Sequence, residues 1–270
     1  MTQSISPWTL LGLGWLAMAV IMAALWAVQW RTRNAGIVDV CWALGVGILG
    51  VAFAALAAGD PARRALIGAC AGLWGLRLGG YLLARVRAEA EDGRYQALRR
   101  RWGARTQPCM FAFFQVQALW AVLFAIPMLV AAGNPAPAGW ADALGVAIWL
   151  VAVGGEVTAD RQLARFRRDP ANRGGVCSVG LWRYSRHPNY FFEWLHWWAY
   201  VAFGLAGPYG WITLMGPLLM LVFLLKVTGV PPTEARALES RGEAYRAYQR
   251  TTNRFFPGPP RPDPQGGEQA

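Results

Sequence analysis

The sequence predicts an all-α fold, a polytopic membrane helical bundle with about seven transmembrane helices. Hydrophobic residues make up 55% of the 270-residue chain. They gather in blocks of about 17 to 23 residues, close to the ~20 that a helix needs to cross the hydrocarbon core of a bilayer. Short arginine-rich segments separate the blocks. This alternation is typical of a multi-pass membrane protein and leaves no room for a separate soluble domain.

The apolar blocks predict the individual spans in chain order. We expect them at residues 8–30, 38–58, 65–84, 110–131, 141–159, 190–206 and 210–230. Clusters of Gly, Pro and Asn separate some of them, as at 133–137 and 207–210, because these residues break helices. Basic residues follow the first block and do not precede it, so we expect a retained helix and not a cleaved signal peptide. We predict one membrane domain over residues 1–256 and a disordered Pro/Gly-rich tail over 257–270.

The charge distribution predicts topology. The net charge is +11, and only one of the 26 basic residues is a lysine. Positive residues beside spans are kept on the cytoplasmic side. We expect seven spans, with the amino terminus outside and the carboxyl terminus cytoplasmic. This topology puts the three arginine-rich stretches, at residues 85–105, 161–186 and 236–254, on the cytoplasmic side of a bacterial inner membrane. We therefore expect membrane lipids, and no nucleic acid, as the partners of the arginines. The four scattered cysteines predict no metal site.

Polar residues lie where lipid is expected. Asn189, Glu193, His196 and Tyr200 are spaced i, i+4, i+7 and i+11, which aligns them on one helix face. An ionisable group at that depth costs at least about 2.5–3.5 kcal/mol, so the stripe must face protein or a water-filled cavity. It is either a functional site or an interhelical hydrogen-bonded seam.

The segment from Gly180 to Tyr190 is the densest polar signal. It contains two arginines, a histidine, a serine and two tyrosines just before the sixth span. Arginines bind phosphate through paired N–H groups, and a helix that begins at Pro188 offers free N–H groups to an anion. The segment predicts a site for a phosphate-bearing cofactor. Binding of anionic lipid headgroups is the alternative.

At this motif the chain resembles the bacterial membrane family related to the steroid 5-alpha-reductases, a family often left as a domain of unknown function. Most of the chain takes part in the resemblance. The matching segments are G-L-W-R-Y-S-R-H-P-N-Y-F-x-E at 180–193, I-V-D-V-C-W-A-L-G at 37–45, W-G-L-R-L-G-G-Y at 74–81, E-V-T-A-D-R-Q-L at 156–163 and R-G-E-A-Y-R-A-Y-Q-R-T-T-N-R-F-F-P at 241–257. In this chain Phe192 stands where that family has glycine, and Trp74 stands near the position of a catalytic tyrosine.

The resemblance implies a membrane oxidoreductase that transfers hydride from NADPH to a conjugated C=C of a lipid or steroid-like enone. The substrate would be a lipophilic small molecule from the bilayer, and no metal is expected. Candidate proton donors are Asp39, Tyr81 and His196. The resemblance and the turn together nominate these cofactor-binding residues: Asp160, Arg167, Tyr184, Ser185, Arg186, His187, Asn189, Tyr190, Glu193, Arg241, Tyr245 and Tyr248.

Two other functions compete with this one. Isoprenylcysteine and phospholipid methyltransferases of membranes carry a similar R-H-P-x-Y turn and tail tyrosines, and they use S-adenosylmethionine. That cofactor has a sulfonium and no phosphate, so the arginine excess around residues 161–186 favours NADPH. A transporter would need a continuous polar path or an inverted repeat. The polar residues concentrate instead in the cytoplasmic half, and no repeat is visible.

Overall fold

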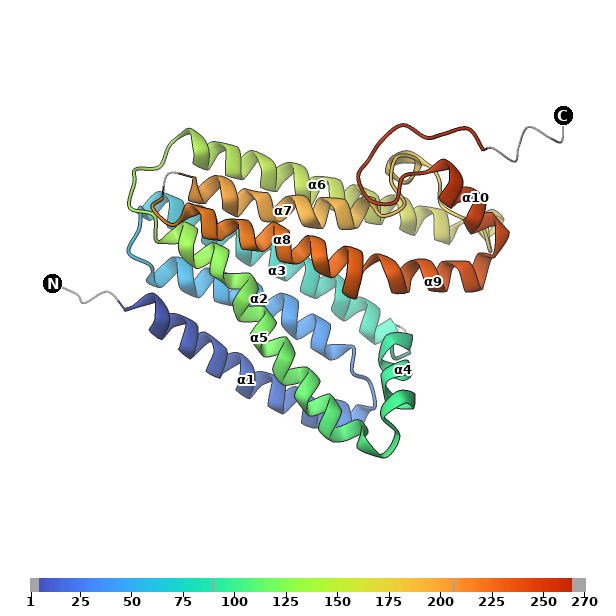
Figure 1. Cartoon of the computed structure of the whole chain (residues 1–270), viewed down its shortest axis with the longest axis horizontal. Coiled ribbons are helices and arrows are strands. Elements are labelled where there is room, and N and C mark those ends of the chain that lie inside the picture. The colour runs from blue at the N-terminus through green and yellow to red at the C-terminus, as the bar shows by residue number, and fades with distance from the viewer. Residues whose placement is uncertain (1–4, 89, 206, 264–270) are drawn as a thin grey trace. The chain divides into compact units, whose positions relative to one another are not determined.

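A computed structural model describes residues 5–88, 90–205 and 207–263. Within these ranges the regular elements are helices and there is no strand. Six helices are long and apolar enough to cross a membrane. The prediction of an all-α, multi-pass membrane protein is therefore confirmed at this level (Figure 1).

The chain divides into two compact units, which we describe separately. Unit 1 contains residues 1–146 and 200–216, and unit 2 contains residues 147–199 and 217–270. Three helices cross from one unit into the other. They are α6 (Trp140–Arg168), α7 (Pro188–Gly204) and α8 (Met215–Val222).

Unit 1 is built on α2 packed against α3, with α1 and α4 against α5. A Cβ on Gly47 of α2 would lie 2.9 Å from the Cα of Gly75 of α3, so the two backbones are in direct contact. Small residues permit such close approach between membrane helices. The complete helices of this unit are α1 (Pro7–Thr32), α2 (Ile37–Leu56), α3 (Pro61–Ala88), α4 (Gly93–Trp102) and α5 (Thr106–Ala132).

Unit 2 contains most of α6 and α7, which run antiparallel. Asn189 of α7 bonds Asp160 of α6, and one turn further along α7 the ring of Phe192 lies on Gly155. A Cβ on Gly155 would lie 2.4 Å from that ring, so only glycine leaves room for it. Beyond α8 the chain forms α9 (Val230–Arg241) and α10 (Glu243–Thr251), which pack on each other.

Two predicted spans are longer than expected. The helices predicted over 65–84 and 141–159 extend to Ala88 and Arg168. Their added turns carry Arg85, Arg87 and the arginines at 165–168, which are good helix formers. Positive charge also interacts favourably with the carboxyl end of the helix dipole. The sixth span, predicted over 190–206, corresponds to α7, which begins at Pro188, the residue expected in the first turn of this helix.

Other predicted elements are divided. The span expected over 210–230 consists of a 3₁₀ turn (Gly210–Leu214), α8 and a π-helical turn (Phe223–Val227). The segment after the π-helical turn is divided at Gly242 into two helices, because its φ of +51° ends the first helix and is accessible mainly to glycine. The basic loop after α3 contains the unpredicted helix α4, which Asp92 caps by accepting a bond from Arg94 N.

The predicted disordered tail is hydrogen-bonded in its described part. Gly258 N donates to Tyr184 O, Arg261 N donates to Thr251 O, and Arg250 forms an ion pair with Asp263. Residues 264–270 of that prediction lie outside the described residues.

Candidate functional site

The turn from Gly180 to His187 is fixed to the end of α6 in unit 2. Gly180 adopts a positive φ of +59° and begins a short 3₁₀ helix. Leu181 N then donates to Gln162 Oε1 at 2.9 Å, and Trp182 Nε1 donates to Ala159 O at 3.0 Å. These bonds explain why the segment forms an ordered turn instead of a mobile basic loop.

Ser185 joins this turn to the chain after α10. Its Oγ donates to Phe255 O at 2.8 Å and accepts from His187 N at 3.1 Å. The second bond satisfies a backbone donor just before α7 begins. Arg186 N donates to Asn253 O at 2.8 Å. The sequence placed Ser185 among the cofactor-binding candidates, and in the structure its contacts lie within the protein.

Glu234 of α9 lies at the centre of a hydrogen-bonded group, which we call the Glu234 cluster. Arg186 Nε donates to Glu234 Oε1 at 2.8 Å, and His187 Nε2 lies 3.3 Å from the same oxygen. Gln249 Nε2 donates to Oε2 at 3.2 Å, and Tyr245 OH donates to Oε1 at 3.5 Å. The cluster therefore connects the turn before α7 with both carboxyl-terminal helices.

Sequence reasoning missed Glu234. A usable signal exists, because Val230 and Ala237 of the same helix are buried and Glu234 falls between them on that face. An acid within an apolar helical stripe requires a buried partner. Arg186 and His187 provide it.

Two tyrosines of α10 complete the connection. Tyr248 OH donates to Trp182 O and, at 3.3 Å, to Ser185 O. Burial raises the pKa of Tyr248, and it raises the pKa of Tyr245 to about 12. Both phenols therefore stay protonated near neutral pH and act as hydrogen-bond donors.

His187 is buried beside Tyr190. The two rings are stacked, with centroids 5.5 Å apart and an interplanar angle of 4°. Burial lowers the pKa of His187, and the neighbouring Glu234 carboxylate opposes that shift only in part. The imidazole is therefore mainly neutral at pH 7, and its ring nitrogen serves the Glu234 cluster as a hydrogen-bond donor.

A polar seam lies between α6 and α7 within unit 2. Asn189 Nδ2 donates to Asp160 Oδ1 at 3.4 Å, and Trp197 Nε1 donates to Glu193 Oε1 at 3.4 Å. His196 is fully buried, and Glu156 of α6 is 5% exposed. Within unit 2 the predicted stripe of α7 thus contains an amide, a carboxylic acid and an imidazole, of which Glu193 and His196 are buried and Asn189 is half-buried.

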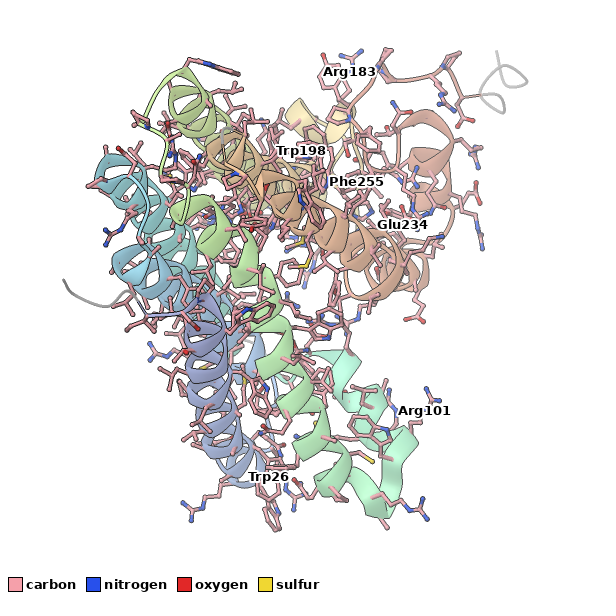
Figure 2. The ribbon with its side chains drawn as sticks, turned by 60° about the vertical axis from the view of Figure 1, so that its left-hand side comes forward. Trp26, Arg101, Arg183, Trp198, Glu234 and Phe255 are labelled. Carbon is pink, nitrogen blue, oxygen red and sulfur yellow. The ribbon has the colours of Figure 1, made fainter. Side chains whose placement is uncertain are left out.

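The arginines near this seam differ in their exposure. Arg186 is buried, and in addition to Glu234 it donates through Nη1 to Gln249 O and Thr252 O. Arg241 donates to Gly175 O. Arg167 and Arg183 are exposed, and Figure 2 shows Arg183 at the edge of the ribbon. Arg167 and Arg183 are therefore open to solvent, whereas Arg186 is buried.

The remaining candidates also lie in unit 2. Tyr184 is 45% exposed beside Arg183, and Tyr190 OH lies 3.2 Å from Thr233 Oγ1. All cofactor-binding candidates named from the sequence thus belong to one unit. Among them Arg167 and Tyr184 are exposed, Glu193 is buried in the seam, and Arg186, His187 and Tyr245 belong to the Glu234 cluster.

Asp39, a candidate proton donor, lies in unit 1 at the start of α2. Its Oδ1 accepts from Tyr95 OH at 2.7 Å, and its Oδ2 accepts from Arg94 Nη2 at 3.0 Å. Both partners come from α4, more than 50 positions away in the sequence. Asp39 therefore lies in the first turn of a helix and also forms a half-buried tertiary cluster with a phenol and a guanidinium.

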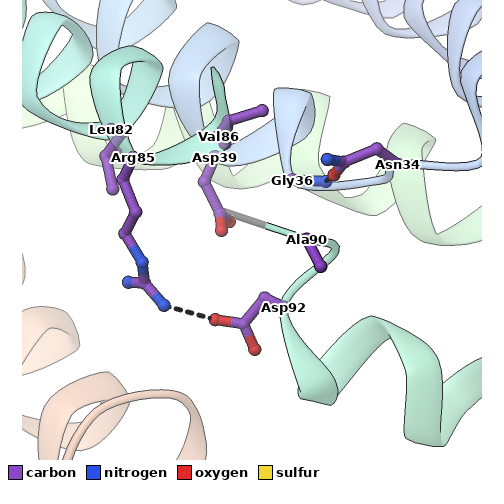
Figure 3. Close-up of a pocket in the computed structure, with 8 residues that line it drawn as sticks. All are labelled: Asn34, Gly36, Asp39, Leu82, Arg85, Val86, Ala90 and Asp92. Carbon is purple, nitrogen blue, oxygen red and sulfur yellow. Dashed lines mark hydrogen bonds and ion pairs between the residues drawn. The ribbon is translucent and has the colours of Figure 1, made fainter. Parts of the chain in front are cut away.

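A small cavity adjoins Asp39 (Figure 3). Its volume is about 20 Å³, which accommodates roughly one water molecule. Arg85 and Asp92, which form an ion pair of 2.8 Å, lie on its far side. The cavity therefore has space for one water beside the Asp39 carboxylate and is too small for a lipid or a nucleotide.

The two other proton-donor candidates have different surroundings. Tyr81 of α3, in unit 1, is 47% exposed, whereas His196 of α7, in unit 2, is fully buried. The cysteines are free, and within residues 5–88, 90–205 and 207–263 no three potential metal ligands gather.

Six helices that are long and apolar enough to cross a membrane define the class, which is a multi-pass membrane protein. The chain belongs to the DUF1295 family, described as a protein of unknown function, which it matches over residues 25–252. It is also 28% identical to an uncharacterized protein of Schizosaccharomyces pombe, over 90% of this chain and 78% of the relative. No solved structure matches the chain.

Proposed function

We propose that the protein is a membrane oxidoreductase that uses NADPH to reduce a conjugated C=C of a lipid or steroid-like enone. Its topology in this proposal has seven spans, with α7 added to the six long helices, an outside amino terminus and a cytoplasmic carboxyl terminus. The membrane is the bacterial inner membrane. The arginine-rich turn of unit 2 then faces the cytoplasm, where NADPH is available.

The observation that carries the proposal is the polar seam of unit 2 together with the exposed arginines beside it. Asp160, Asn189 and Glu193 offer acceptors and an amide that suit ribose hydroxyls and a nicotinamide carboxamide. Arg167 and Arg183 offer positive charge to a pyrophosphate and a 2′-phosphate. The side chains therefore fit a dinucleotide that carries several negative charges.

The chemistry requires a hydride and a proton. When bound, NADPH supplies the hydride, which adds to the β-carbon of the enone. The side chains of the protein orient the two reactants, exclude water and polarise the carbonyl oxygen with an acid. Proton uptake at the α-carbon then completes a saturated ketone and leaves NADP⁺.

Asp39, Tyr81 and His196 remain the proposed sources of the proton. Of these, Asp39 is the one in contact with a phenol that could supply the proton, because Tyr95 OH donates to its carboxylate. Tyr95 joins the candidates as the phenol of this pair. It retains its proton at neutral pH and can donate it to a developing enolate.

The alternative is methyl transfer from S-adenosylmethionine to a lipid. Glu156 and Glu193 favour it, because two buried carboxylates suit a sulfonium cation better than they suit a phosphate. The exposed arginines favour NADPH. The two functions therefore place opposite electrostatic demands on the same unit.

Thermal stabilisation of the purified protein by NADPH, NADH and S-adenosylmethionine, measured in parallel, separates the two functions. We expect NADPH to stabilise most, NADH less and S-adenosylmethionine not at all. Arg183→Gln should weaken NADPH binding, whereas Arg101→Gln, at an exposed arginine of α4 in unit 1, serves as a matched control. Stabilisation by S-adenosylmethionine alone would contradict the reductase.

A further inference from the structure

Glu234 combines two features that no exposed acid of its helix has. Its carboxylate is close to five nitrogen or oxygen donors, since Arg254 Nε adds a longer contact of 4.0 Å to the four already described. The side chain also joins three separate stretches of chain: the turn before α7, α9 and α10. Glu239 of the same helix is exposed.

Arg186 connects the Glu234 cluster to the turn through backbone as well as side chain. Its guanidinium uses Nε for Glu234 and Nη1 for Gln249 O and Thr252 O. Its own backbone N donates to Asn253 O. An arginine with these bonds would lose them if it turned toward a phosphate, and Glu234 would then be left without its nearest cation.

We propose that Glu234 is a positioning residue for the nucleotide site, one that fixes the turn bearing Arg183 and Tyr184 through Arg186 and His187. This inference rests on the proposed function, because it assigns Glu234 a role toward NADPH. Arg186 accordingly acts through the turn and does not contact phosphate. The phosphates are met by the exposed arginines instead.

The proposal predicts a change in NADPH affinity opposite to the one that simple charge repulsion predicts. A carboxylate near a phosphate site repels the phosphate, so removal of its charge should tighten binding if proximity were its only effect. Positioning predicts the opposite, since loss of the carboxylate releases Arg186, His187 and Gln249 together. The Glu234→Gln variant keeps the size of the side chain and removes the charge, and therefore separates the two effects.

The experiment compares Glu234→Gln, Glu234→Ala and the control Glu239→Gln as full-length proteins in detergent. We expect the KM for NADPH to rise about tenfold or more in Glu234→Ala, with kcat at saturating NADPH changed little, as for a loss of uniform binding. Glu234→Gln should show a smaller rise in the same direction. Glu239→Gln should match the wild type.

Hydrogen exchange without any nucleotide provides the second measurement. Amides at 184–187 should exchange faster in Glu234→Ala than in Glu239→Gln, because their fixed partners are released. Tighter NADPH binding by Glu234→Gln, or unchanged exchange at 184–187 in Glu234→Ala, would overturn the proposal. If the wild type binds no NADPH, the proposed function fails, while the exchange measurement still decides whether Glu234 fixes the turn.

Discussion

Two arginine–carboxylate groups, one in each unit, use the same chemistry for different ends. In unit 1, Arg63 binds Asp142, and both side chains are almost fully buried. In unit 2, Arg186 binds Glu234 next to a histidine, two tyrosines and the exposed Arg183. Only the second group is connected to groups that a ligand can reach.

The Arg63 cluster is closed. Arg63 bonds both oxygens of Asp142, at 2.6 and 2.8 Å, and donates to the carbonyl oxygens of Asn134, Ala136 and Pro137. These bonds connect the start of α3 with the start of α6 within unit 1. A buried charge pair whose remaining side-chain bonds go to backbone carbonyl oxygens, with Asp60 accepting from the backbone N of the same arginine, is a structural device. The comparison teaches that burial and pairing alone do not identify a site, whereas connection to exposed, ligand-competent groups does.

The largest effect should come from breaking the closed cluster. Arg63→Ala leaves the Asp142 carboxylate buried without its cation, which costs about 3–5 kcal/mol. We expect a strong fall in the unfolding temperature and in yield, measured by detergent thermal unfolding. Nucleotide affinity of the folded fraction should be unchanged. A loss below about 1 kcal/mol would mean that the cluster relaxes or hydrates more easily than its burial indicates.

The second-largest effect should be on the rate of the proposed reaction. Asp39→Asn keeps an oxygen for Arg94 or Tyr95 but changes the charge beside the cavity, and Tyr95→Phe removes the phenol. Because an acid–base group contributes about 10²–10⁴-fold, we expect enone reduction to fall by at least about 100-fold in either variant with NADPH binding retained. Full activity in both would move the proton donor to Tyr81 or His196. The corresponding variants Tyr81→Phe and His196→Gln then complete the series.

A smaller effect should come from the tyrosine that connects α10 to the turn. Tyr248→Phe removes the bonds to Trp182 O and Ser185 O, worth about 1–3 kcal/mol where buried acceptors are left unpaired. We expect faster hydrogen exchange at 182–187 and several-fold weaker NADPH binding. Tyr209→Phe, at an exposed tyrosine, is the matched control. Equal behaviour of the two variants would argue against the role of α10 in fixing the turn.

The smallest effect should depend on pH. Burial lowers the pKa of His187, with Arg186 and Arg254 acting in the same direction and Glu234 against it. Below the unfolded value of about 6.5 the unfolded chain therefore binds more protons than the folded one, so local stability falls as pH falls through that region and is complete above it. Hydrogen exchange at 184–187, corrected for intrinsic rates, should show this loss. His187→Gln should remove it, and a loss on raising the pH instead would contradict the shift.

The sequence predicts the features that depend on short stretches of chain. Apolar block length and Pro188 predict the membrane helices, because a span is a local property of about 20 residues. The seam of Asn189, Glu193 and His196 is likewise visible from helical spacing. All of this information is local.

The missed features depend on tertiary contacts. The predicted spans leave Arg63 in a loop, whereas in the structure its buried guanidinium bonds Asp142, 79 positions away in the sequence. Tyr95 and Arg94 appear to belong to a basic loop until α4 brings them to Asp39. From the sequence alone, Glu234 resembles a solvated acid on the surface of a helix. The break between α9 and α10 at Gly242 was also missed, because apolar periodicity carries no information about a positive φ. Such partners cannot be found from spacing along one helix.

The most direct test of the central claim follows the transferred group itself. The purified protein is incubated with a 4-ene-3-ketosteroid and with a total lipid extract, together with NADPH deuterated at C4 in either configuration. A parallel incubation contains S-adenosylmethionine with a deuterated methyl group. We predict that deuterium from one form of labelled NADPH appears at the β-carbon of a reduced enone. Deuterated methyl groups in a lipid product, with no deuterium transferred from NADPH, would contradict the account.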